Sequence, residues 1–393
     1  MTLKDNNEIL FITHKYPPSI GGMQKQSYEL ISNLSSLQKV HTIILKEKTP
    51  KLLFLLSAWI RAVWLCTMNH KIKIVHANDG LMAMFISPLL ILRNVRITAT
   101  VHGLDVVFPF FIYQWWIRNI LSKFDLVITV SRETREECIK RNIQPEKVRY
   151  IANGNSFKNM NDTVKPLRNR PQEPFIITSI GRAIPRKGFS WFLESVIPLI
   201  KHPVEYHIAG SIEKKPRLIE ILAKTLPPRF FTLLSLMFGF GIESWKIETL
   251  LKHPNLRSKV KIHGGASNAE IKRLLNDTTL FIMPNMKVEG DYEGFGLVTH
   301  EAISQGCLCL ASEVDGIPSA ISNEETGYLL PERNEEMWAK KINDLLLDSD
   351  SLREINTSFR ENLENNSSSW KEMSTRYLQA FNSLMDSKNS DTA

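Results

Sequence analysis

The chain has 393 residues, of which 43% are apolar and 23% charged, and its formal net charge is +8. This composition excludes an intrinsically disordered chain and is sufficient for two domains of ordinary size. Residues 1–170 carry 24 Lys and Arg against 12 Asp and Glu, whereas the rest of the chain has a net charge of −4. A basic first half favours a domain facing an anionic lipid or a phosphorylated acceptor. We expect no nucleic-acid partner, because no binding motif organises the basic residues.

Three features bear on where the protein works. The first eight residues are polar, so we expect no signal peptide and a protein in the cytoplasm or at the inner face of the cytoplasmic membrane. Residues 52–68 are interrupted by Arg61 and are fewer than the about 20 needed to span a bilayer, so we expect no transmembrane helix. The cysteines lack metal-ligand spacing and are expected to be reduced core thiols: Cys66, Cys138, Cys307 and Cys309.

Short apolar runs rich in β-branched residues recur in the first half and alternate with helix-length segments, which predicts a parallel α/β sheet. The predicted strands are residues 9–13, 40–45, 72–76, 95–101, 125–130 and 148–152. A helix over residues 22–34 follows the first strand, and Gly21 and Gly22 stand at its start. These glycines either bring backbone N–H groups to a phosphate or sugar, or only form a tight turn.

His102 directly follows the strand predicted at residues 95–101. A histidine at the carboxyl edge of a sheet can donate a hydrogen bond into a ligand cleft, and a structural role is the alternative. The aromatic stretch 108–116 is either a core helix or a surface that contacts a membrane.

After a polar, proline-containing linker at residues 153–174, the alternation of strands and helices restarts. Strands are predicted at residues 175–180, 204–209, 259–263, 279–283, 308–311 and 327–330. The interval 211–258 is too long for one crossover helix, so it holds either an extra helix on the core or an amphipathic element that contacts a membrane or partner.

The elements predict an α/β protein with two Rossmann-like doubly wound domains. Residues 1–160 form the first domain, and residues 174–365 form the second, with an insertion around 211–258. A C-terminal helix within residues 366–393 is expected to pack back on the first domain through Trp370, Tyr377, Leu378 and Phe381.

Glu293 and Glu301 flank a loop that contains Gly294 and Gly296. We expect a helix to begin near Gly294, with free N–H groups that attract an anion. In a helix the two carboxylates would lie about 12 Å apart, farther than the about 5–9.5 Å of a glycosidase acid and base. This spacing favours an elongated ligand, with a diphosphate between two hydroxyl-bearing sugars, as in a nucleotide sugar.

Gly181, Arg182, Lys187 and Gly188 lie on the loop after the strand predicted at residues 175–180. Arg can bind two phosphate oxygens at once and Lys supplies a mobile charge, although a solvated basic loop is the alternative. If they bind a departing diphosphate, losing either cation should act mainly on kcat.

Together these motifs resemble the retaining, nucleotide-sugar-dependent glycosyltransferases of family four, which have the GT-B fold of two domains facing a central cleft. The resemblance covers nearly the whole chain, although the interval 211–258 is longer than such proteins usually show. It rests on Tyr16-Pro17-Pro18, Gly21-Gly22, Val101-His102-Gly103, Val130-Ser131, Asn153-Gly154, Gly181-Arg182, Lys187-Gly188, Glu293 and Glu301 with seven residues between them, Asp315-Gly316-Ile317-Pro318 and Thr326-Gly327.

The resemblance implies that the donor sits mainly on the second domain and the acceptor on the first. Arg182 and Lys187 would bind the diphosphate, Glu301 the ribose and Glu293 the transferred sugar, while His102 would touch the sugar or acceptor. Further donor-binding positions would be Gly21, Gly22, Gly181, Gly294, Phe295, Gly296, Leu297 and Val298. No cofactor and no metal is expected, because the cations and the helix dipole would replace Mg²⁺.

The predicted function is retaining transfer of a sugar from a nucleoside-diphosphate donor to a hydroxyl of a glycan or lipid-linked acceptor, in cell-surface polysaccharide or glycolipid biosynthesis. Peripheral contact with an anionic membrane accompanies it. The alternatives are a GT-B-fold nucleotide-sugar epimerase and a non-catalytic nucleotide-sugar-binding subunit. A phosphorylase is disfavoured, because no lysine stands in a recognisable setting for pyridoxal phosphate.

Overall fold

The computed structural model describes residues 7–47, 49–92, 94–156, 174–210, 225–227, 234–235 and 243–390. Contacts divide the chain into two units. The first comprises Met1–Lys158, Glu293–Phe295 and Ser367–Ala393, and the second comprises Asn159–Tyr292 and Gly296–Asn366. Most of the predicted linker, and much of the predicted insertion at 211–258, lie outside the described residues.

The first unit contains a parallel six-stranded sheet in the order β2-β1-β3-β4-β5-β6. Each strand lies within two residues of its predicted bounds, because runs of β-branched residues buried on both faces are typical of central parallel strands. The strands are β1 (Glu8–Thr13), β2 (Val40–Ile44), β3 (Ile72–Ala77), β4 (Arg96–Val101), β5 (Leu126–Thr129) and β6 (Val148–Tyr150).

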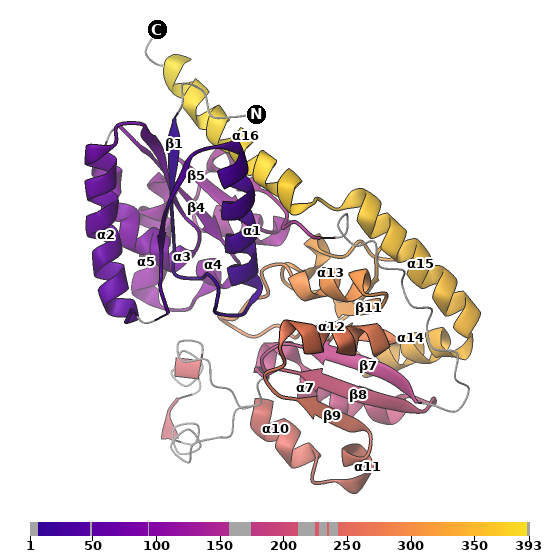
Figure 1. Cartoon of the computed structure of the whole chain (residues 1–393). Coiled ribbons are helices and arrows are strands. Elements are labelled where there is room, and N and C mark those ends of the chain that lie inside the picture. Colours follow the sequence, from indigo (N-terminus) through magenta and orange to yellow (C-terminus); the bar gives the residue numbers. More distant parts are fainter. Residues whose placement is uncertain are drawn as a thin grey trace. The chain divides into compact units, whose positions relative to one another are not determined.

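Helices cover both faces of this sheet (Figure 1). On one face α2 (Lys51–Met68), α3 (Gly80–Ile86) and α5 (Phe111–Asn119) share a hydrophobic core with β1, β3 and β4. On the other lie α1 (Gly22–Leu37) and α16 (Trp370–Ser390). The shorter helices α4 (Leu104–Val107) and α6 (Arg132–Ile139) complete the unit, with 3₁₀ turns at Ser87–Ile91, Leu121–Lys123 and Pro145–Lys147.

The C-terminal helix α16 packs on the first sheet through a buried aromatic side chain. The Tyr377 hydroxyl lies 3.0 Å from Thr100 Oγ1 and accepts a hydrogen bond from Gln26 Nε2 at 3.3 Å. Beneath it, His76 lies between Thr98 and Thr100, at 2.8 and 3.0 Å. Burial lowers the pKa of His76 to about 3, so this imidazole is neutral in the folded protein.

The second unit repeats this architecture with a parallel sheet in the order β12-β11-β10-β7-β8-β9. Its strands are β7 (Phe175–Ile180), β8 (Val204–Ala209), β9 (Val260–His263), β10 (Leu280–Met283), β11 (Leu308–Ser312) and β12 (Tyr328–Leu330). Its helices are α7 (Phe189–Trp191), α10 (Glu243–Leu250), α11 (Pro254–Arg257), α12 (Asn268–Asp277), α13 (Leu297–Ser304), α14 (Glu335–Leu347) and α15 (Ser349–Asn366). A π turn at Phe192–Val196 and a 3₁₀ turn at Ile197–Leu199 continue α7. Further 3₁₀ turns lie at Pro185–Lys187 and Ile317–Ser319.

The strand order confirms the prediction of two doubly wound α/β domains and locates the point where each sheet reverses its winding. In the first sheet this switch lies between β1 and β3, and in the second between β7 and β10. Open α/β sheets bind ligands outside the carboxyl ends of the strands at such points. The loops after these four strands are therefore the candidate ligand-binding loops.

The helix α2 departs from expectation. By length and composition alone this 18-residue helix could cross a membrane, so the length criterion that excluded a span was too strict. However, one stripe of α2 is buried in the core of the first unit: Phe54, Ala58, Ala62 and Cys66. In this structure α2 is thus a packed surface helix.

Candidate functional site

In the second unit, the loop after β7 places two cations at the switch point. Arg182 is exposed, whereas Lys187 is only 9% exposed. The Lys187 side chain lies along Gly181, since a Cβ added to Gly181 would be 3.1 Å from Lys187 Cε. Gly188 has a left-handed backbone (φ 64°), and a Cβ there would be 2.0 Å from the Pro284 carbonyl oxygen. Glycine at position 188 therefore lets the loop after β7 approach the loop after β10.

A buried ion pair joins these two loops. Arg186 Nε lies 3.1 Å from Asp291 Oδ1, and both side chains are less than a tenth exposed. The Met286 N–H donates to the carbonyl oxygen of Arg186 at 2.8 Å. Arg186 therefore connects the two loops, and the neighbouring Lys187 is buried beside Gly181. Sequence reasoning missed this pair, because its members are far apart in the chain and only the strand order brings them together.

The helix after β10 begins later than predicted. We expected a start near Gly294, but α13 starts at Leu297, because Gly296 has a left-handed backbone (φ 87°) that an α-helix does not continue through. The estimate of about 12 Å between the carboxylates assumed a continuous helix and does not apply. The Thr299 N–H donates to the Gly296 carbonyl at 2.9 Å. The N–H groups of Leu297 and Val298 precede this first intrahelical bond and are oriented to meet an anion.

The two glutamates occupy different positions around this turn. Glu301 lies in the second turn of α13 and is half-buried. Glu293 precedes the helix, is also half-buried and is grouped with the first unit, together with Gly294 and the buried Phe295.

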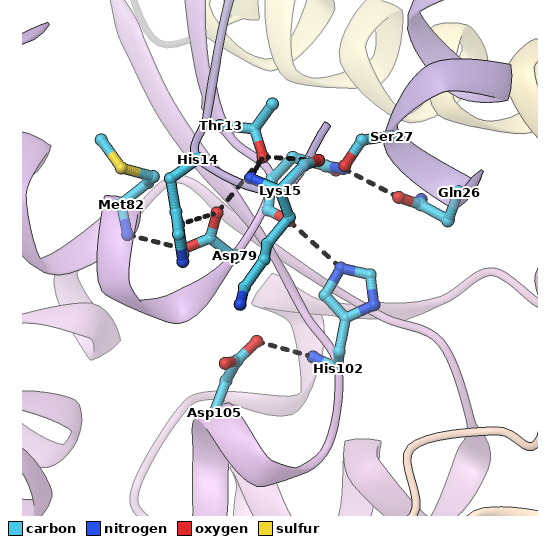
Figure 2. Close-up of polar contacts among 10 residues, drawn as sticks. Thr13, His14, Lys15, Gln26, Ser27, Asp79, Met82, His102 and Asp105 are labelled. Carbon is cyan, nitrogen blue, oxygen red and sulfur yellow. Dashed lines mark hydrogen bonds and ion pairs between the residues drawn. The ribbon is translucent and has the colours of Figure 1, made fainter. Parts of the chain in front are cut away.

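At the carboxyl edge of the first sheet, polar side chains from three strands converge (Figure 2). His14, directly after β1, donates from Nδ1 to Asp79 Oδ2 at 3.1 Å. Asp79, which follows β3, also accepts from Thr13 Oγ1 at 3.3 Å and from the Met82 N–H at 2.9 Å, which caps α3. Burial raises the pKa of Asp79, but the hydrogen bond and charge of His14 outweigh it and hold the pKa below its ordinary value. Asp79 is therefore a buried carboxylate that orients an imidazole.

His102 lies beside this pair, on the loop after β4 (Figure 2). Its Nε2 is 3.1 Å from the Asn78 carbonyl oxygen, and its backbone N–H donates to Asp105 Oδ2 at 3.0 Å. Because a carbonyl only accepts, Nε2 carries the proton in the neutral ring and Nδ1 presents a lone pair. His102 can thus accept a hydrogen bond from a hydroxyl, whereas the sequence suggested that it donates one. Burial and the charge of Asp79 raise the pKa of Asp105.

Gly21 and Gly22 lie at the same switch point, on the loop that connects β1 to α1. Gly21 is the N-cap residue of α1, accepts the Lys25 N–H at 3.0 Å and is exposed, as is Gly22. The 16-residue helix α1 starts at Gly22 and presents its N-terminal N–H groups at this edge.

The structure therefore gathers the candidate residues into two groups, one in each unit. The first unit brings Gly21, Gly22 and His102 to the edge that also carries His14 and Asp79, which the sequence reasoning did not select. The second brings together the loops that carry Gly181, Arg182, Lys187 and the start of α13. His14 could have been found from its signal, a polar residue directly after a strand, but its partnership with Asp79 required the order of the strands.

Comparison with known proteins identifies the family. Residues 161–367, more than half of the chain, match the family described as Glycosyl transferases group 1. The chain belongs to this family. Residues 6–155 match the model described as Glycosyltransferase Family 4, so the two matches together cover both units.

The chain is similar to several known relatives. The amylovoran biosynthesis glycosyltransferase AmsK of Erwinia amylovora is 23% identical to it over 64% of the chain and 55% of AmsK. The GPI3 subunit of the phosphatidylinositol N-acetylglucosaminyltransferase of Saccharomyces cerevisiae is 23% identical over 82% of the chain and 64% of GPI3. The chain thus spans less than two thirds of the length of these relatives. The crystal structure of Anabaena HepE in complex with UDP is 15% identical with a TM-score of 0.70, over 96% of the chain and all of HepE, which shows the shared fold.

Across the residues that the structure describes, no group of three or more His, Cys, Asp and Glu side chains is arranged to hold a metal ion. Catalysis without a metal stays a prediction.

Proposed function

We propose that this glycosyl transferases group 1 member moves a sugar from a nucleoside-diphosphate donor to a hydroxyl of a glycan or lipid-linked acceptor, with retention at the anomeric carbon. The observation that carries the proposal is the switch point of the second sheet, where the buried Lys187 lies along Gly181 and α13 begins after the neighbouring strand. HepE, which has a similar fold, was solved with UDP and with UDP-glucose. AmsK is named as a glycosyltransferase of amylovoran biosynthesis.

In this proposal the second unit binds the nucleotide part of the donor. Lys187 and Arg182 bind the diphosphate, and the N–H groups of Leu297 and Val298 supply further donors to its oxygens. Glu301 accepts hydrogen bonds from the ribose hydroxyls, and Glu293 from the transferred sugar.

The reaction breaks the bond between the anomeric carbon and the diphosphate oxygen, and the electron pair stays on the diphosphate. The acceptor oxygen attacks from the same face, and its proton passes to the departing phosphate oxygen. Lys187 and Arg182 stabilise the negative charge that develops there, so they act on the transition state more than on the bound donor.

We assign the acceptor side to the first unit. His102 Nδ1 would accept a hydrogen bond from a sugar or acceptor hydroxyl, and the His14 imidazole, oriented by Asp79, offers a second polar contact at the same edge. The net charge of +12 in residues 1–170 favours an anionic acceptor and peripheral contact with an anionic membrane.

The test begins with a thermal-shift screen of nucleoside-diphosphate sugars, in which a ligand at 100 times its Kd should add roughly 2.7 kcal/mol of stability. The selected donor is then followed by NMR with and without acceptor hydroxyl compounds. We expect transfer only with an acceptor, and a product with the anomeric configuration of the donor. Conversion of the donor alone would instead indicate an epimerase, and binding without turnover on any acceptor would indicate a binding subunit.

The roles of the cations are tested with Lys187→Ala. Loss of one charge that stabilises the departing group should lower kcat by about 100-fold or more and change the donor Kd much less. The exposed Lys252 on the same unit provides the control Lys252→Ala, which should turn over like the wild type. Unchanged kcat in Lys187→Ala would refute the assignment.

A further inference from the structure

The helix α2 exposes an apolar outer face. Seven of its large apolar side chains are between 40% and 67% exposed: Leu52, Leu53, Leu56, Trp59, Ile60, Trp64 and Met68. Surface helices of globular proteins usually present charged and polar residues to solvent. Contiguous exposed patches of this kind mark sites of interaction.

The orientation of α2 is fixed by its inner side. Phe54, Ala58, Ala62 and Cys66 recur every four residues and are buried in the core of the first unit. Three of these four are small, so the helix lies close to the sheet, and its largest side chains are directed away from the core. Rotation of α2 to bury its large outer residues would remove this inner stripe from the core.

A second helix adds to this apolar surface. Phe110, Phe111, Ile112 and Trp115 at the start of α5 are between 40% and 76% exposed. The same helix buries Trp116 and Ile117 in the core that also holds the inner stripe of α2. The aromatic stretch 108–116 therefore contributes to the core on one side of α5, as one alternative predicted, and exposes apolar side chains on the other. We call the exposed residues of α2, together with these four, the apolar face of α2 and α5.

Basic residues accompany this face. Residues 39–96, which include α2, carry nine Lys and Arg against two Asp and Glu. Lys51 and Arg61 on α2 and Arg118 on α5 are exposed, and neither helix contains an acidic residue. Of the two acidic residues, Asp79 is buried against His14, which leaves Glu47 as the exposed one.

We infer that the apolar face of α2 and α5 docks the first unit onto an anionic lipid bilayer, with both helices lying in the interface. The inference rests on the membrane contact in the proposed function and identifies the surface that makes it. Apolar residues with tryptophan on the outer side, flanked by Lys and Arg, have the composition of interfacial helices. A second copy of the chain is the less favoured occupant, because a two-fold interface would bring the same basic residues together.

Docking through this surface would serve a lipid-linked acceptor. α2 and α5 each follow the carboxyl end of a strand, and this edge of the sheet carries His14 and His102. An acceptor anchored in the bilayer would then reach a hydroxyl-binding edge on the unit that is held at the membrane.

The experiment is flotation of the full chain with vesicles of phosphatidylcholine, with and without phosphatidylserine, at low salt. We expect the wild type to float with the anionic vesicles. Trp59→Glu combined with Trp64→Glu should lower the partition coefficient at least about tenfold. The control is Leu347→Glu, because Leu347 is 73% exposed on the second unit and lies outside the interval 211–258, and it should float like the wild type.

A charge variant separates the electrostatic contribution. Arg61→Gln should lower binding to anionic vesicles about fivefold and leave the weak binding to neutral vesicles unchanged. The thermal shift given by the donor, measured without vesicles, reports that each variant is folded.

Two results would overturn the inference. One is a wild type that stays in the dense, vesicle-free fraction at low salt. The other is a tryptophan double variant that binds the donor and floats like the wild type. A concentration-dependent dimer that dissociates on the same substitutions, without vesicle binding, would assign the face to a second copy of the chain. This result would also overturn the inference. Failure of the proposed function would appear separately, as a lack of donor binding or transfer in a protein that still floats.

Discussion

Asp79 tests both the geometry of the first unit and its assignment to the acceptor. Replacement by Ala removes three hydrogen bonds: the cap of α3 at Met82, worth about 1 kcal/mol, the bond from Thr13, worth about 1 kcal/mol, and the charge-assisted bond from His14, worth about 1.5–3 kcal/mol. The sum of about 3.5–5 kcal/mol is a large part of the roughly 5–15 kcal/mol that stabilises a typical protein. Asp79→Ala is therefore expected to unfold readily and is unsuitable for kinetics.

Asp79→Asn is the informative variant. An Asn oxygen can still cap α3 through the Met82 N–H, and the amide nitrogen can donate to Thr13 Oγ1. The expected loss is therefore confined to the charge-assisted bond from His14, about 1.5–3 kcal/mol in urea unfolding. Because the folded-state pKa of Asp79 is depressed, its stabilising contribution is complete above the unfolded-state pKa of 3.8 and is lost as the pH falls through the folded-state value. The difference between wild type and Asp79→Asn should therefore be constant at neutral pH and shrink under acid conditions.

The functional expectation follows from the orientation of His14. Without the carboxylate the imidazole is no longer held in one tautomer, and kcat/KM for the acceptor should fall at least about tenfold, while donor binding to the second unit is unchanged. A double-mutant cycle with His14→Gln isolates the pair. The reasoning would be refuted if Asp79→Asn were as stable as the wild type, or if the acceptor kinetics did not change in a folded variant.

Three further predictions concern the cores and the loop after β7. Gly188→Ala should cost at least about 2 kcal/mol in urea unfolding and weaken donor binding, since its Cβ would meet the Pro284 carbonyl and its backbone is left-handed; wild-type behaviour would contradict the described loop contact. His76, with its pKa lowered to about 3, should make stability fall below pH 6.5 by up to about 1.4 kcal/mol per pH unit, and His76→Asn should flatten this slope. Tyr377→Phe should cost about 1 kcal/mol, because Thr100 and Gln26 each lose a hydrogen bond to the Tyr377 hydroxyl; no change in the urea midpoint would argue against this contact of α16.

The positions of the strands could be predicted from the sequence, whereas their order in the sheets could not. A run such as residues 175–180 is locally apolar and β-branched, and this local property sets where a strand forms. The pairing of β1 with β3, or of β7 with β10, depends on contacts between residues far apart in the chain. The His14–Asp79 and Arg186–Asp291 pairs depend on this order, so the sequence alone did not predict them.

Local sequence patterns also did not determine which side of α2 faces the core or where α13 begins. A hydropathy window over α2 averages its two faces and does not reveal that the small residues face inward and the tryptophans outward. At Gly296, the spacing of the glutamates suggested a helix that includes the glycines. The left-handed backbone of that residue, which sequence permits but does not require, moves the start of α13 to Leu297.

Burial distinguishes the two cations that the sequence treats as equals. Arg182 is exposed, so water and salt screen its charge, whereas Lys187 is nine-tenths buried at the switch point. A charge in a site with little water acts more strongly on a neighbouring anion than the same charge in solvent. In the proposed reaction Lys187 is the buried cation assigned to the departing diphosphate, whereas Arg186 forms an ion pair with Asp291. It follows that Lys187 should carry the larger share of transition-state stabilisation, with Arg182 contributing more to donor capture.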